Sequence, residues 1–313
     1  MGGVVTQTDR LSARTPADQS TGSPNLLGYA RRVFDVVYVS PHLDDAVFSA
    51  GGAIALDVRS GRRVAVATVF SRGGEEALRR REDRTALARL GAAQIDLALA
   101  EAPARDPSLV GARLFAPLGD GSAPLVDEVR AALASVARGA EVVAPLGVGR
   151  HADHQIVHAA SAALDGKVSY YEDLPYALCR PLVARRLAAL GSPVAVAGGG
   201  IGRVLSFWVI ARFWAERPLL HDAAPWIARP LAAAMIAWWQ WRGATDRLAP
   251  ARPFTEERID VSAAIDDKLA AIAAYESQWR RFFPSVAGFR SALAAHALAL
   301  GSRVAIERRW RRA

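Results

Sequence analysis

The chain has 313 residues, of which 51% are hydrophobic and 22% are charged, and it contains a single cysteine. A chain of this size and composition can build a full hydrophobic core, which excludes a disordered protein, and one cysteine excludes a disulfide framework or a multi-cysteine zinc site. The net charge is +8 and almost all of it comes from arginine, since lysine occurs only at Lys167 and Lys268. Such a surface is compatible with nucleic acid, an anionic membrane or phosphorylated substrates, but scattered arginine is more often a solvated face.

The amino-terminal segment lacks the basic and then apolar order of a secretory signal. We therefore expect a cytoplasmic location by default. The polar composition of residues 1–26 predicts a disordered tail.

Short apolar segments alternate with segments of helical periodicity from Phe34 onward. The run FDVVYVS at 34–40 is typical of a buried strand. Further strands are expected at 62–71, 93–99, 141–147 and 167–174, with helices at 46–61, 75–91, 126–139 and 151–164. This alternation predicts an α/β fold, a Rossmann-like, doubly wound and mostly parallel sheet with helices on both faces. Active sites of such folds lie outside the carboxyl ends of the strands.

Residues 180–250 depart from this alternation and hold six of the eight tryptophans, which predicts a helical, Trp-rich insertion. Its longest clean apolar run, LAAAMIAWW, is about half the roughly 20 residues that a membrane span requires. Two interpretations stay open: helices that pack with tryptophan in the core, or an interfacial or lid element with arginine on one side. Two more helices are expected at 266–283 and 288–301, so we interpret residues 27–313 as a single α/β domain with an insertion at about 180–250.

The segment SPHLDD at 40–45 lies where the first expected strand ends and a helix begins. Two adjacent carboxylates repel each other, a cost that a bound cation removes. His42 and Asp45 are three residues apart and can direct a ring nitrogen and a carboxylate oxygen toward one point. Asp44 then projects elsewhere and is free to accept a proton from water.

A second segment, GVGRHADH at 147–154, also follows an expected strand. A doubly wound sheet can bring it beside the first segment, so that His154 completes a site of two histidines and one carboxylate. Three protein ligands leave one position open, as in catalytic zinc sites, although iron and other divalent ions accept the same ligands. His151 can then stabilise an oxyanion, with Asp153 fixing its tautomer.

Each segment taken alone has an ordinary structural explanation. HADH can be a helix start with Asp153 as the N-cap, and PHLDD can be a strand-to-helix turn with acidic residues in the first helical turn. Both segments, however, follow expected strands, and together they hold four of the six histidines. Their joint occurrence favours a metal site.

The segments SPHLDDAVFSAGG and HADHQIVHAA together resemble the PIG-L/LmbE-like family of metal-dependent de-N-acetylases. The likeness extends to the helix that contains Arg79 and to YYEDLPYA at 170–177, so it covers roughly residues 33–177, with a weaker similarity in YESQWRRFF and ERRWRR. The resemblance implies roles for seven residues: His42, Asp45 and His154 as zinc ligands, Asp44 as general base, His151 as oxyanion or acid partner, Asp153 as its orienting group, and Arg79 as a substrate contact.

Two features depart from the family pattern. Some members carry tyrosine two residues before the first histidine of the second motif, where it can assist the oxyanion, and this chain has Gly149 there. Either His151 works without that help or another residue supplies it. The Trp-rich stretch has no counterpart in the pattern, which leaves the substrate open.

The expected activity is hydrolysis of an N-acetyl or other N-acyl group from an amino sugar or glycoconjugate, with Zn²⁺ as cofactor and Fe²⁺ or another divalent ion as an alternative. The Trp and Arg residues of the insertion suggest an amphiphilic substrate and peripheral membrane contact through residues 200–245. No nucleic acid partner is expected, and the sequence does not indicate an oligomeric state. The alternatives are an amidase that acts on another conjugate with the same metal site, and an Arg-rich protein that binds an anionic surface.

Overall fold

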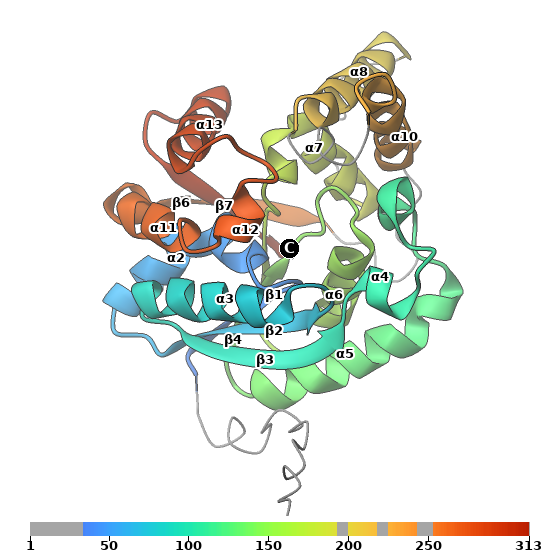
Figure 1. The fold of residues 1–313 in the computed structure, drawn as a ribbon. Helices are drawn as coiled ribbons and strands as arrows, with labels where there is room; N and C mark the ends of the chain where they lie inside the picture. The colour runs from blue at the N-terminus through green and yellow to red at the C-terminus, as the bar shows by residue number, and fades with distance from the viewer. Residues whose placement is uncertain (1–33, 193–199, 218–224, 243–252, 313) are drawn as a thin grey trace, which may run out of the picture.

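The structure is a computed structural model that describes residues 34–192, 200–217, 225–242 and 253–312 (Figure 1). The tail expected at residues 1–26 lies outside the described residues. The described strands form one seven-stranded sheet in the order β3-β2-β1-β4-β5-β7-β6. Their bounds are β1 Val36–Ser40, β2 Val64–Arg72, β3 Ala93–Ala100, β4 Glu141–Pro145, β5 Val168–Tyr171, β6 Phe254–Asp260 and β7 Ile306–Arg312.

Helices cover both faces of the sheet, which confirms the expected α/β class (Figure 1). One group, formed by α2, α3 and α11, packs together on one face, and α5 and α6 pack together on the other. The helices of the sheet region are α2 Asp45–Arg59, α3 Glu76–Leu90, α4 Ala102–Arg105, α5 Ala123–Val136, α6 Ala152–Ala162, α11 Ile265–Ile272, α12 Glu276–Trp279 and α13 Val286–Ala299. The single helix expected at 266–283 is therefore two helices, α11 and α12.

The strands β1 to β5 are parallel, and the chain order reverses between β1 and β4. From β1 the chain winds outward through β2 to β3, then returns to place β4 on the other side of β1. All five residues of β1 are buried, as the unbroken apolar run predicts for a central strand. The carboxyl ends of β1 and β4 thus border the crevice in which doubly wound folds bind their ligands.

The sheet continues on the β5 side with two antiparallel strands that the sequence did not predict. Strand β7 pairs with β5, and β6 pairs with β7. Both strands consist mostly of charged and polar residues, as in FTEERID and IERRWRR, so they lack the apolar run by which a buried strand is recognised. Their stability comes partly from charges paired across the strands, such as Arg311 with Glu257 at 2.9 Å.

The Trp-rich stretch contains three described helices, α7 Arg180–Ala189, α8 Gly200–Ala215 and α10 Arg229–Arg242. Helices α8 and α10 pack against each other at the edge of the molecule in Figure 1. None of the described helices is long and apolar enough to cross a membrane. The interpretation of residues 27–313 as one domain with an insertion stays a prediction.

Candidate metal centre and active site

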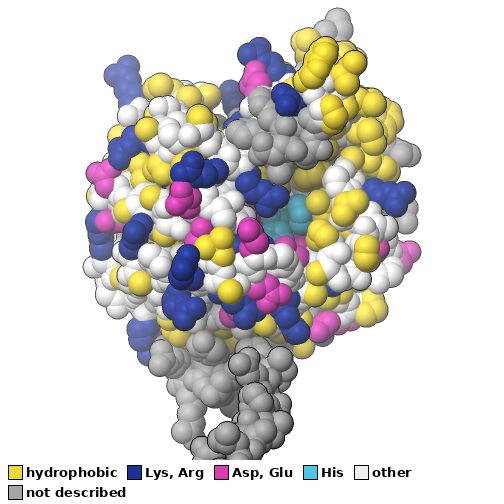
Figure 2. Space-filling view, in the orientation of Figure 1, with side chains coloured by type: hydrophobic (Ala, Val, Ile, Leu, Met, Phe, Trp, Pro, Cys, Tyr) yellow, Lys and Arg dark blue, Asp and Glu magenta, His cyan; other side chains and the backbone are white. Residues whose placement is uncertain are grey.

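The loops after β1 and β4 bring the two histidine-containing segments together at the carboxyl ends of these strands. The first loop is fastened by Ser40, whose Oγ accepts the N–H of Ala46 at 3.0 Å. Because β1 and β4 are adjacent and parallel, with Tyr38 beside Val143, their following loops emerge side by side. In Figure 2, histidine side chains are visible in a hollow near the centre of the molecule.

Three potential metal ligands lie together, with the two histidines converging on the carboxylate of Asp45. Oδ2 of Asp45 lies 3.0 Å from Nδ1 of His42 and 3.2 Å from Nε2 of His154. One donor atom from each of these residues lies within 4.8 Å of the others, which is close enough for a single ion to contact all three. This cluster can bind a metal ion, as the spacing of the two segments predicts.

The His154 ring is held from behind by Asp173, which follows β5. Nδ1 of His154 donates to Oδ1 of Asp173 at 2.6 Å, so that Nε2 is the nitrogen that faces Asp45. Oδ2 of Asp173 accepts the backbone N–H groups of Gly147 and Val148, both at 2.8 Å. Asp173 thus fixes both the ring and the loop that carries it, a role that the sequence analysis did not assign.

The carboxylate of Asp153 contacts His42 and does not act on the ring of His151 as expected. Oδ2 lies 2.9 Å from Nε2 of His42, and Oδ1 accepts from Arg105 at 2.6 Å. Only the backbone N–H of Asp153 reaches His151, donating to Nδ1 at 3.3 Å. His151, and not Asp153, is therefore the N-cap residue of α6. Asp153 thus orients the ring of His42, the histidine of the first segment.

Burial and the neighbouring carboxylates act in opposite directions on the pKa of His42 and of His154, and the carboxylates prevail at both. Burial disfavours the charged form of His154, but Asp45 and Asp173 outweigh it and raise the pKa of His154 to about 9. Burial disfavours the cationic form of His42 as well, yet the hydrogen bonds to Asp153 and Asp45 raise its pKa well above the usual range. Two histidines that attract protons in this way offer an electron-rich site that a divalent cation can neutralise.

Asp44 lies beside the cluster, at the N-cap position of α2. Its side chain makes no capping hydrogen bond to α2, and the residue is 8% exposed. Burial, followed by repulsion from Asp45, raises the pKa of Asp44 to about 6. Arg79 lowers that pKa through its charge, and its guanidinium is paired with Glu101. The structure thus places Arg79 near Asp44, while its contact with a substrate stays a prediction.

His151 lies next to His42, and the centroids of the two rings are 5.0 Å apart. Loss of water around the ring, followed by the charge of His42, lowers the pKa of His151 to about 3. The ring is therefore neutral at physiological pH. Because Nδ1 accepts the Asp153 N–H, the proton of the neutral ring is on Nε2.

Residues 37–164 match a family model named PIG-L and described as GlcNAc-PI de-N-acetylase. This segment is a PIG-L domain. It contains all seven site residues named from the sequence: His42, Asp44, Asp45, Arg79, His151, Asp153 and His154.

Proteins similar to this chain include characterised deacetylases. A 2'-N-acetylparomamine deacetylase of Streptomyces fradiae is 34% identical over 164 residues, which cover 44% of this chain and 56% of that protein. The matched part thus spans about half the length of that relative. The zinc-inhibited form of teicoplanin deacetylase Orf2 superposes with a TM-score of 0.57 at 20% identity, covering 88% of this chain and 96% of that chain. The A40926 pseudoaglycone deacetylase Dbv21 superposes with a TM-score of 0.51 at 18% identity over 89% and 96% of the two chains. At these identities the superpositions show a shared fold.

The space beside Gly149 of the PIG-L domain is filled by Tyr176, which comes from beyond the matched segment. Gly149 has φ +82°, and a Cβ on it would lie 2.7 Å from Cδ1 and 2.9 Å from Cβ of Tyr176, and closer still to Cγ. The Tyr176 ring also lies against His154, with the centroids 5.9 Å apart. No feature of the sequence pairs residues 149 and 176, although Tyr176 belongs to the YYEDLPYA segment that carries the resemblance.

The Trp-rich helices reach this same loop. Gln240 of α10 donates to the carbonyl of Gly149 at 2.7 Å, and Trp214 of α8 donates to Gln240 at 2.8 Å. The Trp214 ring packs against Phe115, with the centroids 5.1 Å apart, and Phe115 packs against His151. The inner sides of α8 and α10 thus form part of the surroundings of the site.

Proposed function

We propose that the protein is a metal-dependent hydrolase that removes an N-acetyl or other N-acyl group from an amino sugar or its conjugate. The observation that carries the proposal is the convergence of His42, Asp45 and His154 at the switch point of the sheet, with Asp44 beside them. The PIG-L match and the deacetylase relatives support this choice of reaction.

The three residues fit a metal such as zinc, with Fe²⁺ or another divalent ion as the alternative. Two imidazoles and one carboxylate are a ligand set of catalytic zinc, and the outward nitrogens of both rings are already held by carboxylates, as is usual for zinc-binding histidines. When bound, the ion lowers the pKa of a coordinated water and polarises the amide carbonyl.

Asp44 is assigned the role of general base. It is adjacent to the ligand Asp45, is nearly buried, and is not used by the helix cap, so its carboxylate is available to accept the proton of the attacking water. The same carboxyl group can return this proton to the amine that leaves.

His151 is assigned to the oxyanion. Its neutral ring carries the proton on Nε2, and a positioned donor of this kind typically contributes about 10²–10³ in rate. We assign Asp153 to the positioning of His42, which changes the role that the sequence predicted for it. Arg79 remains our candidate for a substrate contact, by its charge near Asp44.

The relatives support our choice of substrate class. One is a 2'-N-acetylparomamine deacetylase, and two chains of similar fold are deacetylases of teicoplanin and of the A40926 pseudoaglycone. We propose a glycoconjugate of comparable size as the substrate, in a cytoplasmic setting.

The direct test is Asp44→Asn in the full chain. The variant should retain stoichiometric metal, because none of the three proposed ligands is altered, while turnover falls by at least about 10². Metal content is measured by elemental analysis, and turnover by mass-spectrometric loss of an acyl group from a panel of N-acetylated amino sugars and conjugates. Full activity of Asp44→Asn rejects the assignment of the base.

His154→Ala is the companion variant, and it should lose the metal and the activity together. A panel in which only another amide is cleaved would instead identify an amidase with the same metal site.

A further inference from the structure

The outer side of the α8–α10 helix pair exposes an unusual amount of apolar surface. Twelve large hydrophobic side chains are exposed in the described parts of the chain, and nine of them lie between Val204 and Trp238. Figure 2 shows hydrophobic side chains gathered over the position of these two helices. Isolated apolar side chains on a surface are ordinary, whereas a contiguous patch of this kind marks an interaction site.

On α8 the exposed residues share one face of the helix. Val204, Leu205, Trp208 and Val209 recur at helical spacing and are 49–62% exposed. The opposite side is buried, with Ile210 at 0% and Trp214 at 1% exposure. The buried side of α8 therefore packs against the rest of the protein, whereas its outer apolar side is exposed.

On α10 and the turn before it the same division holds. Trp226 and Ile227 are 77% and 73% exposed, and the stripe continues along the helix at Leu231, Met235 and Trp238. We call these exposed residues of α8 and α10, with the turn, the apolar face. It carries three tryptophans, a residue type that is enriched where proteins meet the headgroup region of a bilayer.

The same part of the chain carries most of the net charge. Residues 180–250 contain nine arginines against three acidic residues, a net +6 of the chain's +8. Among the described residues of this stretch, Arg180 and Arg212 are exposed and Arg185, Arg217 and Arg229 are partly exposed. A second copy of the chain docked through this face would bring such guanidinium groups of both copies toward one another, which like charges oppose. An anionic lipid surface would be attracted instead.

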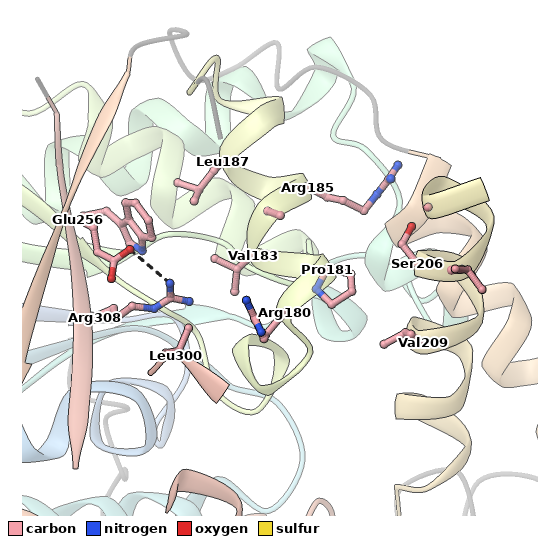
Figure 3. Close-up of a pocket in the computed structure, with 14 residues that line it drawn as sticks. Arg180, Pro181, Val183, Arg185, Leu187, Ser206, Val209, Glu256, Leu300 and Arg308 are labelled. Atoms are coloured by element: carbon pink, nitrogen blue, oxygen red, sulfur yellow. Dashed lines mark ion pairs between the residues drawn. The ribbon is translucent and has the colours of Figure 1, made fainter. Parts of the chain in front are cut away.

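A cavity adjoins the apolar face. It has a volume of about 620 Å³ and lies between α7, α8 and the strands β6 and β7 (Figure 3). Leu205 and Val209 of the apolar face also line it, and Arg180 is exposed beside these apolar walls. None of the candidate site residues lines this cavity. The apolar face is thus hollowed, with a guanidinium near its edge.

Helices α8 and α10 have 16 and 14 residues, fewer than the roughly 20 that span a bilayer. A helix pair of this length, apolar and Trp-rich on one side within an arginine-rich region, is suited to lie in the plane of the interface. We propose that the apolar face of α8 and α10 binds the surface of an anionic lipid bilayer. This proposal does not depend on the reaction proposed above.

The test is co-sedimentation of the full chain with vesicles of phosphatidylcholine alone and of phosphatidylcholine mixed with phosphatidylglycerol. The wild type should bind the anionic vesicles, bind the neutral ones more weakly, and lose affinity as salt is raised. Replacing two exposed side chains, in the double variant Leu205→Ser/Trp208→Ser, should lower the partition coefficient by at least about tenfold.

Leu298→Ser is the matched control, because Leu298 is 66% exposed but lies on α13, outside the apolar face. It should bind as the wild type does, and thermal unfolding should show all three proteins equally folded. Equal binding by the double variant and the wild type would overturn the proposal, as would no binding by the wild type. Sedimentation velocity without lipid tests the other occupant of the face, a second copy of the chain. If the wild type is a dimer, the double variant is a monomer and neither binds vesicles, the apolar face is an interface between copies and the lipid proposal is rejected.

Discussion

Two buried carboxylates, Asp153 and Asp173, determine how the site histidines are presented. Each contacts the ring nitrogen that faces away from the ligand cluster and also accepts a backbone N–H, from Ala102 and from Gly147 respectively. A carboxylate in this position fixes the ring orientation and makes the opposite nitrogen a better ligand. The two histidine ligands of the proposed site are therefore held in place before a metal arrives.

Asp153→Asn tests this arrangement at the carboxylate whose contact with His42 the sequence did not predict. The change removes the negative charge that faces His42 and Arg105, so metal affinity should fall by about 10–100-fold while folding is retained. The affinity is measured by competition with a chelator of known strength. Asp57→Asn is the control, because Asp57 bonds Tyr38 and lies on neither site loop. An affinity equal to that of the wild type would show that Asp153 does not support the ligand.

Position 149 requires glycine for two reasons: its backbone has a positive φ, and the Tyr176 ring fills the space where a Cβ would lie. Gly149→Ala should destabilise the protein and reduce activity, because the new methyl group enters the space of the Tyr176 ring. Gly61→Ala separates the two causes, since Gly61 has nearly the same φ, +84°, and open space around it. We expect about 1 kcal/mol for the backbone cost at Gly61 and about 1–3 kcal/mol more at Gly149. Denaturant unfolding measures the free energy of unfolding of both variants. Equal losses of stability would mean that the Tyr176 ring moves aside at no cost in free energy.

At the level of elements, the sequence predicted the five parallel strands, and four of these five are mostly buried. Strands β1, β2, β4 and β5 are buried on both faces and show as apolar runs, which is also why both site loops could be placed. Strands β6 and β7 are rich in charged residues, with only two apolar or aromatic residues each, and β7 pairs with β5 from a distant part of the chain. The assignment of Asp153 to His42 was missed for a related reason: residues 42 and 153 are 111 positions apart, and only loop geometry decides which ring the carboxylate meets.

Strand β7 also supplies an ion pair that anchors α2. Glu307 accepts from Lys268 at 2.7 Å and from the backbone N–H groups of Gly52 and Ala53 at 2.9 and 2.8 Å. Both side chains are buried, at 1% and 7% exposure. This contact lies just after the kink at Ala50, in the helix that begins at the site residue Asp45.

Glu307→Ala should lower the free energy of unfolding by about 3–5 kcal/mol, because it leaves a buried ammonium group without its counter-charge. Glu257→Ala, which removes an exposed partner of Arg311, should cost less than about 1 kcal/mol. Urea unfolding of both variants gives the comparison. A small loss for Glu307→Ala would mean that Lys268 reaches water or another partner.

At the scale of the whole molecule, the carboxyl-terminal elements close over helices of the first half of the chain. Helix α11 packs on α2 and α3, and Tyr275, between α11 and α12, donates to Oδ1 of Asp83 at 2.6 Å. Gln94 of β3 donates to the other oxygen at 2.5 Å. Asp83, which is 1% exposed, thus joins α3 and the following strand β3 to Tyr275, which is 192 positions away in the sequence.

This junction makes stability depend on pH. Burial raises the pKa of Asp83 to about 7, with Asp44 and Asp96 adding to the effect and the hydrogen bonds from Tyr275 and Gln94 opposing it. An unfolded aspartate titrates near 3.9, so between about pH 4 and 7 the folded state binds more protons than the unfolded state. The contribution of Asp83 is therefore complete below about pH 4 and is lost as the pH rises through about 7.

Asp83→Asn keeps a neutral side chain at every pH and should remove this slope. The free energy of unfolding of the wild type minus that of the variant is expected to decrease by a few kcal/mol between about pH 4 and 8. Urea unfolding at a series of pH values measures the difference, in which the titration of all other groups cancels to a first approximation. Parallel curves for the two proteins would show that Asp83 titrates in the folded state as it does in the unfolded state, and that the hydrogen bonds from Tyr275 and Gln94 offset its burial.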